Sequence, residues 1–276
     1  MTFPLDVDTP RLRRTLTWPQ GIDDTATALG ERTVNLLGVP VHAVSHAGAL
    51  QQIERWIAAP DRPRLVMTPD STALMQARST HGLRRAYERA DLVTADGTGL
   101  VWASRQLGCP LPERVTGIDL LSVLCERSAA KQRRVYLLGG RPGVALEAAQ
   151  RLHRRHPGLS IVGTHHGYFA DDESERIVGE INGLEPDLLL VGMGVPRQEI
   201  WMSRHGHRLA TPVAMGVGGS LDVLAGRVRR APVAWQSLGL EWLWRAVQEP
   251  HRVCRARLIP QFMARILCER ARLAVD

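Results

Sequence analysis

The chain has 276 residues, of which 44% are hydrophobic and 23% charged, a balance that suits a soluble globular protein with a full core. Its net charge of +7 predicts an anionic partner, which could be nucleic acid, a phosphate-bearing substrate or an anionic membrane face. Lys131 is the only lysine, so arginine carries nearly all the positive charge, either for bidentate phosphate contacts or through the bias of a GC-rich genome.

Cysteine usage and hydropathy exclude several further classes. The four cysteines, at positions 109, 125, 254 and 268, form no C-x-x-C pair, so neither a disulfide framework nor a zinc site is expected. Residues 1–10 have no apolar core of a signal peptide, and no stretch approaches the roughly 20 apolar residues that cross a bilayer. We expect a cytoplasmic protein that touches a membrane at most from its inner face.

Apolar strands alternate with amphipathic helices from residue 33 onward, after a leader (1–32) without a steady hydrophobic period. Helices are predicted over 45–59, from Ser71, around Trp102, and over 118–130 and 143–155, with more between the later strands. The predicted strands, several running into a loop, lie at 34–44, 64–68, 91–99, 135–140, 160–169, 187–194 and 212–219. This alternation predicts an α/β fold with a parallel sheet.

Six of the loops that follow these strands carry glycine or proline, in most cases beside a polar residue. In parallel α/β sheets, ligands bind outside the carboxyl ends of the strands, so these loops mark the expected binding edge. The six loops are 68–70, 96–97, 139–140, 167–168, 194–198 and 218–222. Their agreement is more informative than any one of them alone.

The stretch 187–199, DLLLVGMGVPRQE, is the clearest of these units. Its apolar run predicts a strand buried on both faces, and Pro196 suits the first position of a helix. Gln198 and Glu199 then fall in the first helical turn, beside backbone N–H groups that can bind an anion.

The chain changes character after Arg227. Residues 245–276 hold seven arginines against three acids. An apolar stripe recurs at helical spacing within them: Leu258, Ile259, Phe262, Met263, Ile266 and Leu267. Such a basic amphipathic helix either packs on its own domain or lies on a membrane surface.

No motif predicts a metal site or a redox cofactor. The pairs His42/His46 and His165/His166 lack further ligands at useful spacing, and the acidic run 171–173 reads more simply as a helix start. Neither G-x-G-x-x-G, a P-loop nor G-x-S-x-G is present. Nucleic-acid binding has only the net charge in its favour, since there is no helix-turn-helix signature and aromatic residues are few.

Asp96 is the carboxylate best placed for catalysis. It stands between Ala95 and Gly97 at the end of a predicted strand, where it is open to a ligand and can act as a general base. From spacing alone, a helix N-cap at this position is at least as plausible. Thr68 and Asp70 supply a hydroxyl and a second carboxylate from a neighbouring loop, with turn and cap chemistry as the alternative.

Seven segments together resemble the WecG/TagA/CpsF family of bacterial glycosyltransferases, over about residues 33–255. They occur in the family's order and spacing: TADGTGLVWASRQLG (94–108), PERVTGIDLL (112–121), VYLLGGRPGVA (135–145), HGYF (166–169), DLLLVGMGVPRQEIW (187–201), GVGGSLDVLAGRVRRAP (216–232) and GLEWLWRAVQEPHR (239–252).

The resemblance implies a fold, a reaction and partners. The fold would be a Rossmann-like parallel sheet with flanking helices (33–230) and a basic helical C-terminal appendage (231–276) that covers the site and contacts the membrane. The enzyme would transfer a sugar from a UDP-sugar to a polyprenyl-diphosphate-linked saccharide at the inner membrane face. Transfer would proceed with inversion and without a metal or other cofactor, in cell-surface polysaccharide synthesis, and a homo-oligomer is compatible with this.

The family's motifs also imply roles for single residues. Asp96 matches the base that deprotonates the acceptor hydroxyl, and Thr68 matches its companion threonine. Three residues match positions around the UDP: Tyr168, Gln198 and Asp222. Three match arginines of the appendage: Arg245, Arg252 and Arg255. The glycines of the predicted donor loops, Gly139, Gly140 and Gly194, are expected beside the UDP-sugar.

Position 70 departs from the family, which usually has asparagine where this chain has Asp70. A carboxylate cannot donate the hydrogen bond that an amide donates to a sugar, and a second carboxylate near Asp96 would raise a pKa. This departure motivates an alternative hypothesis, a UDP-sugar-binding or membrane adaptor protein with the same fold and no turnover.

Overall fold

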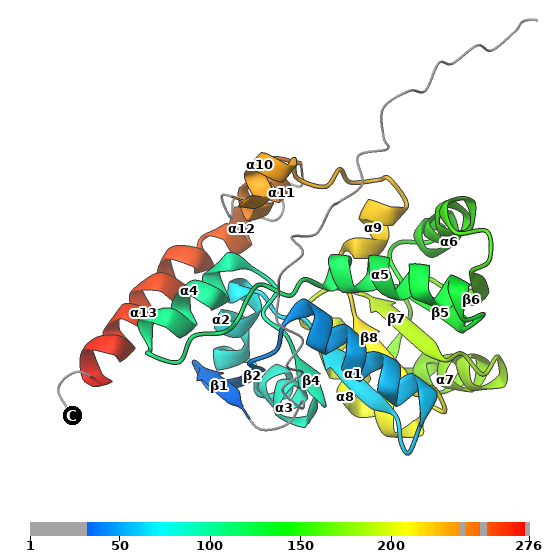
Figure 1. Cartoon of the computed structure of the whole chain (residues 1–276), viewed down its shortest axis with the longest axis horizontal. Helices are drawn as coiled ribbons and strands as arrows, with labels where there is room; N and C mark the ends of the chain where they lie inside the picture. Colours follow the sequence, from blue (N-terminus) through cyan, green and yellow to red (C-terminus); the bar gives the residue numbers. More distant parts are fainter. Residues whose placement is uncertain (1–31, 238–240, 249–252, 274–276) are drawn as a thin grey trace, which may run out of the picture.

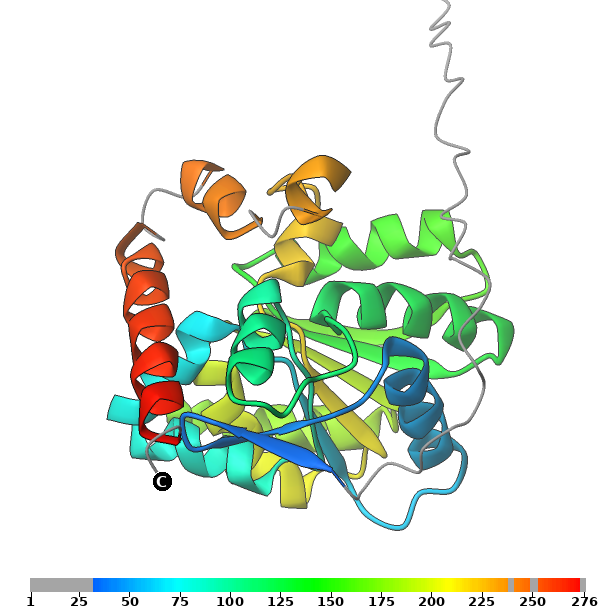
Figure 2. The same cartoon turned by 60° about the vertical axis from the view of Figure 1, so that its left-hand side comes forward.

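The structure is a computed structural model that describes residues 32–237, 241–248 and 253–273, so all but the last residue of the predicted leader lies outside it. A six-stranded, all-parallel sheet has the strand order β4-β3-β8-β7-β5-β6, and helices cover both of its faces (Figures 1 and 2). The strands of the sheet are β3 Arg64–Met67, β4 Leu92–Val93, β5 Arg134–Gly139, β6 Ser160–His165, β7 Leu188–Gly192 and β8 Val213–Gly216. The predicted Rossmann-like parallel sheet is confirmed.

The helices follow the predicted positions closely. In chain order they are α1 His46–Ala58, α2 Ser71–Ser79, α3 His81–Arg89, α4 Thr98–Gln106, α5 Gly117–Ala130, α6 Val144–Arg155, α7 Ser174–Gly183, α8 Arg197–His205, α9 Ser220–Leu224, α10 Val233–Ser237, α11 Glu241–Gln248, α12 Val253–Ala256 and α13 Leu258–Leu273. Two short 3-10 turns, η1 Asp171–Glu173 and η2 Gly206–Arg208, precede α7 and follow α8. Helix α8 begins at Arg197, one residue later than predicted, because Pro196 takes the N-cap position.

Strand β7 shows how the sheet separates two hydrophobic cores. Leu188 and Leu190 point to the face covered by α1, α5, α6 and α9. Leu189 and Val191 point to the opposite face, covered by α2, α3, α4, α7 and α8. All four side chains are fully buried, which is the reason that the strand reads as an unbroken apolar run.

Residues 34–44 correct the sequence prediction, which had one strand there. They lie mostly in an antiparallel hairpin outside the main sheet, β1 Thr33–Leu36 and β2 Val39–His42. Leu37 and Gly38 turn the chain with positive φ values of 54° and 87°. The Asn35 side chain accepts a hydrogen bond from the Gly38 N–H at 2.7 Å, which stabilises the turn.

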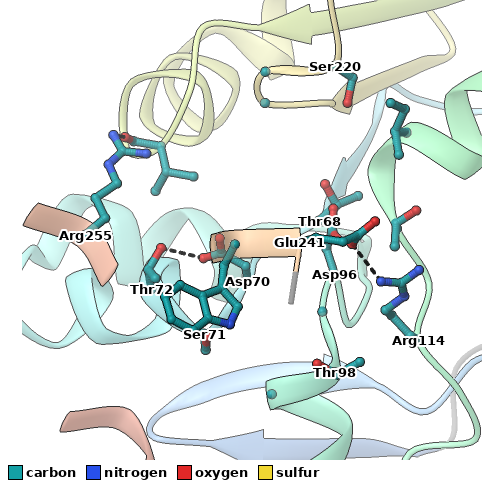
Figure 3. Close-up of a pocket in the computed structure, with 18 of the residues that line it drawn as sticks. Thr68, Asp70, Ser71, Thr72, Asp96, Thr98, Arg114, Ser220, Glu241 and Arg255 are labelled. Carbon is teal, nitrogen blue, oxygen red and sulfur yellow. Dashed lines mark hydrogen bonds and ion pairs between the residues drawn. The ribbon is translucent and has the colours of Figure 1, made fainter. Parts of the chain in front are cut away.

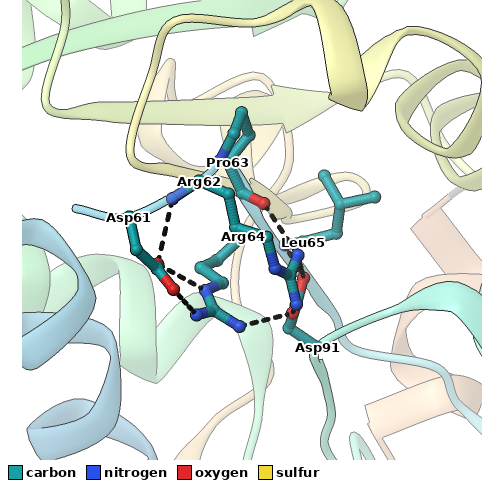
Figure 4. A network of polar contacts seen from close by, with 6 residues as sticks. All are labelled: Asp61, Arg62, Pro63, Arg64, Leu65 and Asp91. Carbon is teal, nitrogen blue, oxygen red and sulfur yellow. Dashed lines mark hydrogen bonds and ion pairs between the residues drawn. The ribbon is translucent and has the colours of Figure 1, made fainter.

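At the amino-terminal edge of the sheet, Asp91 binds residues at the start of β3 (Figure 4). Its side chain is 6% exposed and forms ion pairs with Arg62 and Arg64. It also accepts a hydrogen bond from the Leu65 N–H at 2.9 Å. These contacts join the start of β3 to β4 at the edge opposite the predicted site, so their role is structural.

Helix α13 packs against α2 and α4, as Figure 2 shows for the red C-terminal helix. Phe262 and Ile266 from the predicted stripe are buried in that core. Met263 and Leu267 from the same stripe remain 44% and 47% exposed. The interpretation as a helix packed on its own domain is therefore confirmed for one side of α13, and contact with a membrane surface stays a prediction. Within the described ranges, no helix is long and apolar enough to cross a membrane.

Candidate active site

A cavity of about 570 Å³ opens at the carboxyl edge of the sheet. Its walls come from the loops after β3, β4, β7 and β8, from the segment that enters α5, and from helices α11 to α13 (Figure 3). Six of the predicted site residues line it: Thr68, Asp70, Asp96, Gly194, Gln198 and Arg255. A cavity of this size and place is typical of a small-molecule site in an α/β protein.

Asp96 lies three residues after the short strand β4, in a loop that main-chain bonds hold in place. Its N–H donates to the Pro69 carbonyl at 3.0 Å, and the Val115 N–H donates to the Ala95 carbonyl at 2.9 Å. The carboxylate accepts a hydrogen bond from the N–H of Gly117 at 2.9 Å. Gly117 is the first residue of α5, so a helix N-terminal amide holds the carboxylate from outside its own loop. Asp96 is not the N-cap of α4, a position that Gly97 takes.

The surroundings of Asp96 raise its pKa to about 7. The largest cause is burial, which disfavours the charged carboxylate, and the nearby charge of Asp70 acts in the same direction. The Gly117 N–H and the charge of Arg114 oppose the rise. A carboxylate with a pKa near neutrality is suited to take and release a proton at physiological pH.

Thr68 lies beside Asp96 in a closely packed arrangement (Figure 3). Its hydroxyl donates to the Gly216 carbonyl at 3.0 Å, which joins the end of β3 to the end of β8. A Cβ on Gly117 would lie only 2.7 Å from the Thr68 hydroxyl and 3.5 Å from the Asp96 carboxylate. Glycine at position 117 therefore allows all three groups to meet.

Asp70 lines the cavity and is also the N-cap of α2. One of its carboxylate oxygens accepts hydrogen bonds from the Ala73 N–H at 2.8 Å and the Thr72 hydroxyl at 2.7 Å. The oxygen of an asparagine could accept both bonds, so the cap tolerates either residue. The cap interpretation is confirmed for Asp70, and its charge also acts on Asp96 as the sequence predicted.

Gln198 is 2% exposed, and its side-chain amide is bound within the protein. The oxygen accepts from the Gly218 N–H at 3.0 Å, and the nitrogen donates to the Glu199 carboxylate at 2.8 Å. The Gln198 backbone N–H donates to the Gly194 carbonyl at 3.0 Å, which closes the loop at the start of α8. The predicted contact between Gln198 and UDP stays a prediction.

Four other predicted residues lie along the same sheet edge but do not line this cavity: Gly139, Gly140, Tyr168 and Asp222. A Cβ on Gly139 would meet the Gly192 carbonyl at 2.3 Å, and one on Gly140 would meet Val144 at 2.5 Å. Close packing against the end of β7 thus accounts for Gly139, and close packing against the start of α6 accounts for Gly140. Tyr168 is 61% exposed, with the Arg141 guanidinium 6.0 Å from its ring centre.

The three predicted arginines are described unequally. Arg255 lies across the cavity from Thr68 and Asp96, and its guanidinium donates to the Val195 carbonyl at 3.0 Å (Figure 3). Arg245 lies on α11, but its side chain is outside the described part of the structure. Arg252 falls outside the described residues altogether.

Sequence reasoning missed two ion pairs that join the appendage and the segment before it to the sheet domain. Arg114 donates to Glu241 on α11 at 2.7 Å, and Arg230 donates to Asp119 on α5 at 2.6 Å. Arg114 and Glu241 both line the cavity. Arg114 lies within the PERVTGIDLL segment, one of the segments that carry the family resemblance. Its partner Glu241 could be identified only from the fold.

Metal binding finds no additional support in the described ranges, where no group of three or more His, Cys, Asp or Glu side chains could hold an ion. The described polar groups of the cavity include three carboxylates, the hydroxyls of several threonines and serines, and three arginines. Such a set can deprotonate an alcohol on one side and stabilise a phosphate on the other.

A parallel α/β sheet with a carboxylate and arginines around a cavity at its carboxyl edge is typical of α/β proteins that bind a nucleotide or another anionic small molecule. The sequence profile of the glycosyl transferase WecG/TagA/CpsF family matches residues 34–275, and the chain belongs to this family.

Curated relatives agree with the family assignment. Proteins of Staphylococcus aureus strains MW2 and NCTC 8325 are each 35% identical over 237 residues, which cover 84% of this chain and 91% of the relative. Each of these relatives is named N-acetylglucosaminyldiphosphoundecaprenol N-acetyl-beta-D-mannosaminyltransferase. The chain is thus a glycosyltransferase similar to these mannosaminyltransferases along most of its length.

Proposed function

We propose that this glycosyltransferase moves an N-acetylmannosaminyl group from a UDP-sugar to an N-acetylglucosaminyl-diphospho-polyprenol acceptor, with inversion at the transferred carbon. The relatives' names supply the sugar and the acceptor. The family resemblance of the motifs supplies the UDP donor and the inversion. The observation that carries the proposal is the Asp96 carboxylate, held on the cavity wall by the Gly117 N–H at 2.9 Å.

Asp96 acts as the general base. An acceptor hydroxyl that enters the cavity gives its proton to the carboxylate while its oxygen attacks the sugar carbon. The bond from that carbon to the diphosphate oxygen breaks in the same displacement, and UDP leaves with the electron pair. Attack from the face opposite the leaving group inverts the configuration. Thr68, held by the Gly216 carbonyl, fixes the wall beside the reacting hydroxyl.

The departing diphosphate needs positive charge or N–H donors where its own charge develops. Arg255 supplies a guanidinium across the cavity from the base, and Arg114 supplies a second one beside Glu241. Arg245 and Arg252 join them by family resemblance. In this mechanism arginines stand where many transferases use a divalent ion.

Tyr168 is proposed to hold the nucleotide at the outer end of the donor site. Its ring is 61% exposed and has the Arg141 guanidinium nearby, so a base can stack on it and a phosphate can approach the arginine. The adjacent loop is bound to the sheet, since the Gly167 N–H donates to the Gly140 carbonyl at 2.8 Å. Asp222 completes this side of the site by family resemblance.

Purified protein incubated with a panel of UDP-sugars and a short-chain lipid-linked N-acetylglucosamine tests the proposal directly. Transfer of N-acetylmannosamine, detected by mass spectrometry of the lipid product, is the expected result. Activity should persist in EDTA, because the mechanism uses arginines in place of a metal. The panel includes UDP-glucose and the uronic acid of N-acetylmannosamine, and exclusive use of either would correct the donor. Absence of transfer from every donor would refute the proposal.

The inner face of the cell membrane is the proposed place of action. The acceptor's lipid tail lies in the bilayer, and α13 presents Met263 and Leu267, 44% and 47% exposed, on a basic helix. Replacing both by glutamate should lower binding to anionic phosphatidylglycerol vesicles by about tenfold in a sedimentation assay. Leu146→Glu on α6, where the leucine is 54% exposed, is the matched control and should leave binding unchanged. Equal binding by the double variant would disprove the membrane role of α13.

A binding protein without turnover is the alternative that Asp70 suggested. Because Asp70 caps α2 as an asparagine can, the departure at this position does not require a loss of activity. UDP binding without transfer to the lipid acceptor would favour this alternative. A homo-oligomer and the domain boundary near residue 230 stay predictions, which light scattering and limited proteolysis can check.

A further inference from the structure

Glu199 is a buried acid whose surroundings disfavour a charged carboxylate. Its side chain is 1% exposed, and one of its two carboxyl oxygens has no hydrogen-bond partner among the described residues. Burial raises its pKa to about 7, and the charge of Asp70 adds to the rise. The Tyr87 hydroxyl from α3 is also buried without a described partner. Burying a carboxyl group with an unpaired oxygen lowers the stability of the fold, so we expect this residue to have a compensating role. Its contacts indicate what that role is.

The Glu199 side chain accepts a hydrogen bond from the neighbouring Gln198. The Gln198 amide nitrogen donates to the carboxyl at 2.8 Å, and the amide oxygen accepts from the Gly218 N–H at 3.0 Å. A backbone N–H can only donate, so the oxygen must face Gly218 and the nitrogen must face Glu199. The Gly218 N–H and the Glu199 carboxyl together hold the Gln198 amide in this direction.

The segment that Gln198 holds forms one wall of the cavity. Residues 217–220 line the cavity, and Gly218 has a positive φ of 54°. A Cβ on Gly216 would lie 2.9 Å from the Gln198 amide nitrogen, so glycine at 216 makes room for this side chain. The Gly216 carbonyl is bound in turn by the Thr68 hydroxyl at 3.0 Å. The end of β8 is therefore held by Gln198 on one side and by Thr68 on the other.

We propose that Glu199 is a positioning residue of the transfer site: through the Gln198 amide it holds residues 216–219 in the shape that the sugar-nucleotide donor meets. This inference rests on the proposed function and adds a residue to it. Glu199 touches neither the cavity nor the reacting atoms; it acts on the donor only through Gln198 and the Gly218 N–H. Arg255 and Asp70 are the charged groups that act on it from the neighbouring elements.

Steady-state kinetics of two Glu199 variants test this role. Glu199→Leu removes the acceptor and leaves the Gln198 nitrogen unpaired, so the donor KM and the Kd for UDP should each rise by about tenfold. The KM for the lipid acceptor should stay within about twofold of wild type, since one side of the site is affected. Glu199→Gln keeps an oxygen that accepts from Gln198, so it should restore the donor KM to within about threefold.

A matched control separates positioning from general loosening of the fold. Trp201→Phe removes another buried hydrogen bond on α8, the 3.2 Å bond from the indole N–H to Ser174, away from residues 216–219. It should lower the thermal midpoint without raising the donor KM. The Gln198→Leu variant should match Glu199→Leu, and the double variant should be no worse than Gln198→Leu alone. If Glu199→Leu does not fold, Gln198→Leu and Glu199→Gln carry the same prediction.

The outcomes divide clearly. An unchanged donor KM in Glu199→Leu, an equal rise in Trp201→Phe, or additive effects in the double variant would overturn the inference. A wild-type protein that transfers no sugar would instead refute the proposed function, and the calorimetric Kd for UDP would still report on Glu199.

Discussion

Two walls of the cavity are built in different ways. The sheet wall holds its functional side chains by main-chain partners: Asp96 accepts from the Gly117 N–H, and Thr68 donates to the Gly216 carbonyl. The appendage wall, which is formed by α11 to α13, is joined to the sheet domain largely by side-chain contacts. Its pair between Arg114 and Glu241 is 21% and 28% exposed.

The difference teaches which part of the site the fold itself determines. Main-chain partners are placed by strands and helices that cannot move independently, so Asp96 and Thr68 are positioned whenever the domain folds. A partly exposed ion pair contributes about 1 kcal/mol or less, because water and salt compete with it. We therefore expect catalysis to depend steeply on the sheet wall and only weakly on any single appendage contact.

Asp96→Asn should have the largest effect. It keeps the shape of the side chain and removes the base, so kcat should fall by about 10²–10⁴-fold, with the donor KM little changed. The matched control is Asp61→Asn, at the opposite edge of the sheet and 63% exposed, which should retain full turnover. Near wild-type turnover of Asp96→Asn would show that Asp96 is not the general base. It would also contradict the expectation that catalysis depends more steeply on the sheet wall than on the appendage wall.

Gly117→Ala should come next. The new Cβ would lie 2.7 Å from the Thr68 hydroxyl, so Thr68 or the start of α5 must shift, and kcat/KM should fall by about 10–100-fold. Gly179→Ala in α7 is the control, because a Cβ there meets nothing within 4 Å. That control should be neutral or slightly stabilising in thermal unfolding. Full activity of Gly117→Ala would show that the sheet wall adapts.

The pH dependence of kcat/KM should report on Asp96, because below its pKa the ionised fraction of a carboxyl group changes about tenfold per pH unit. Because the base must be ionised and its pKa is raised to about 7, log kcat/KM should rise with pH up to about 7 and then level off. The free energy of unfolding should change in the opposite direction and fall as the pH rises. The folded state holds this proton longer than the unfolded state, so the free energy of unfolding should fall between pH 3.8 and about 7.

Urea unfolding at several pH values checks the sign of this linkage. Asp96→Asn should flatten part of the slope, and the remainder should come from Glu199, whose pKa is also raised to about 7. A rate profile with its midpoint near pH 4 would contradict the raised pKa of Asp96.

Glu241→Gln should have the smallest effect. It breaks the pair with Arg114 and removes a charge that raises the pKa of Asp96, so the midpoint of the rate profile should move down by about half a unit or less. The maximal kcat/KM should change by about threefold or less. A loss as large as that of Gly117→Ala would mean that the two walls matter equally.

Much of the fold could be predicted from local patterns. The strand 187–194 reads as buried on both faces because Leu188 and Leu190 enter one core and Leu189 and Val191 the other. Ser45 caps α1 as predicted, accepting from the Gly48 N–H at 3.1 Å. The segment 34–44 was wrong as a single strand, because its apolar residues do not reveal that Leu37 and Gly38 reverse the chain.

The sequence by itself determined the parallel sheet, its binding edge, the family and Asp96 as the best candidate base. These follow from local periodicity and from motifs, which need no knowledge of distant contacts. Only the tertiary structure decided which groups meet. The Gly117 N–H that holds Asp96 is 21 residues away, and the Gly216 carbonyl that holds Thr68 is 148 residues away. Such pairs depend on the order of strands in the sheet, which spacing along a single chain does not encode.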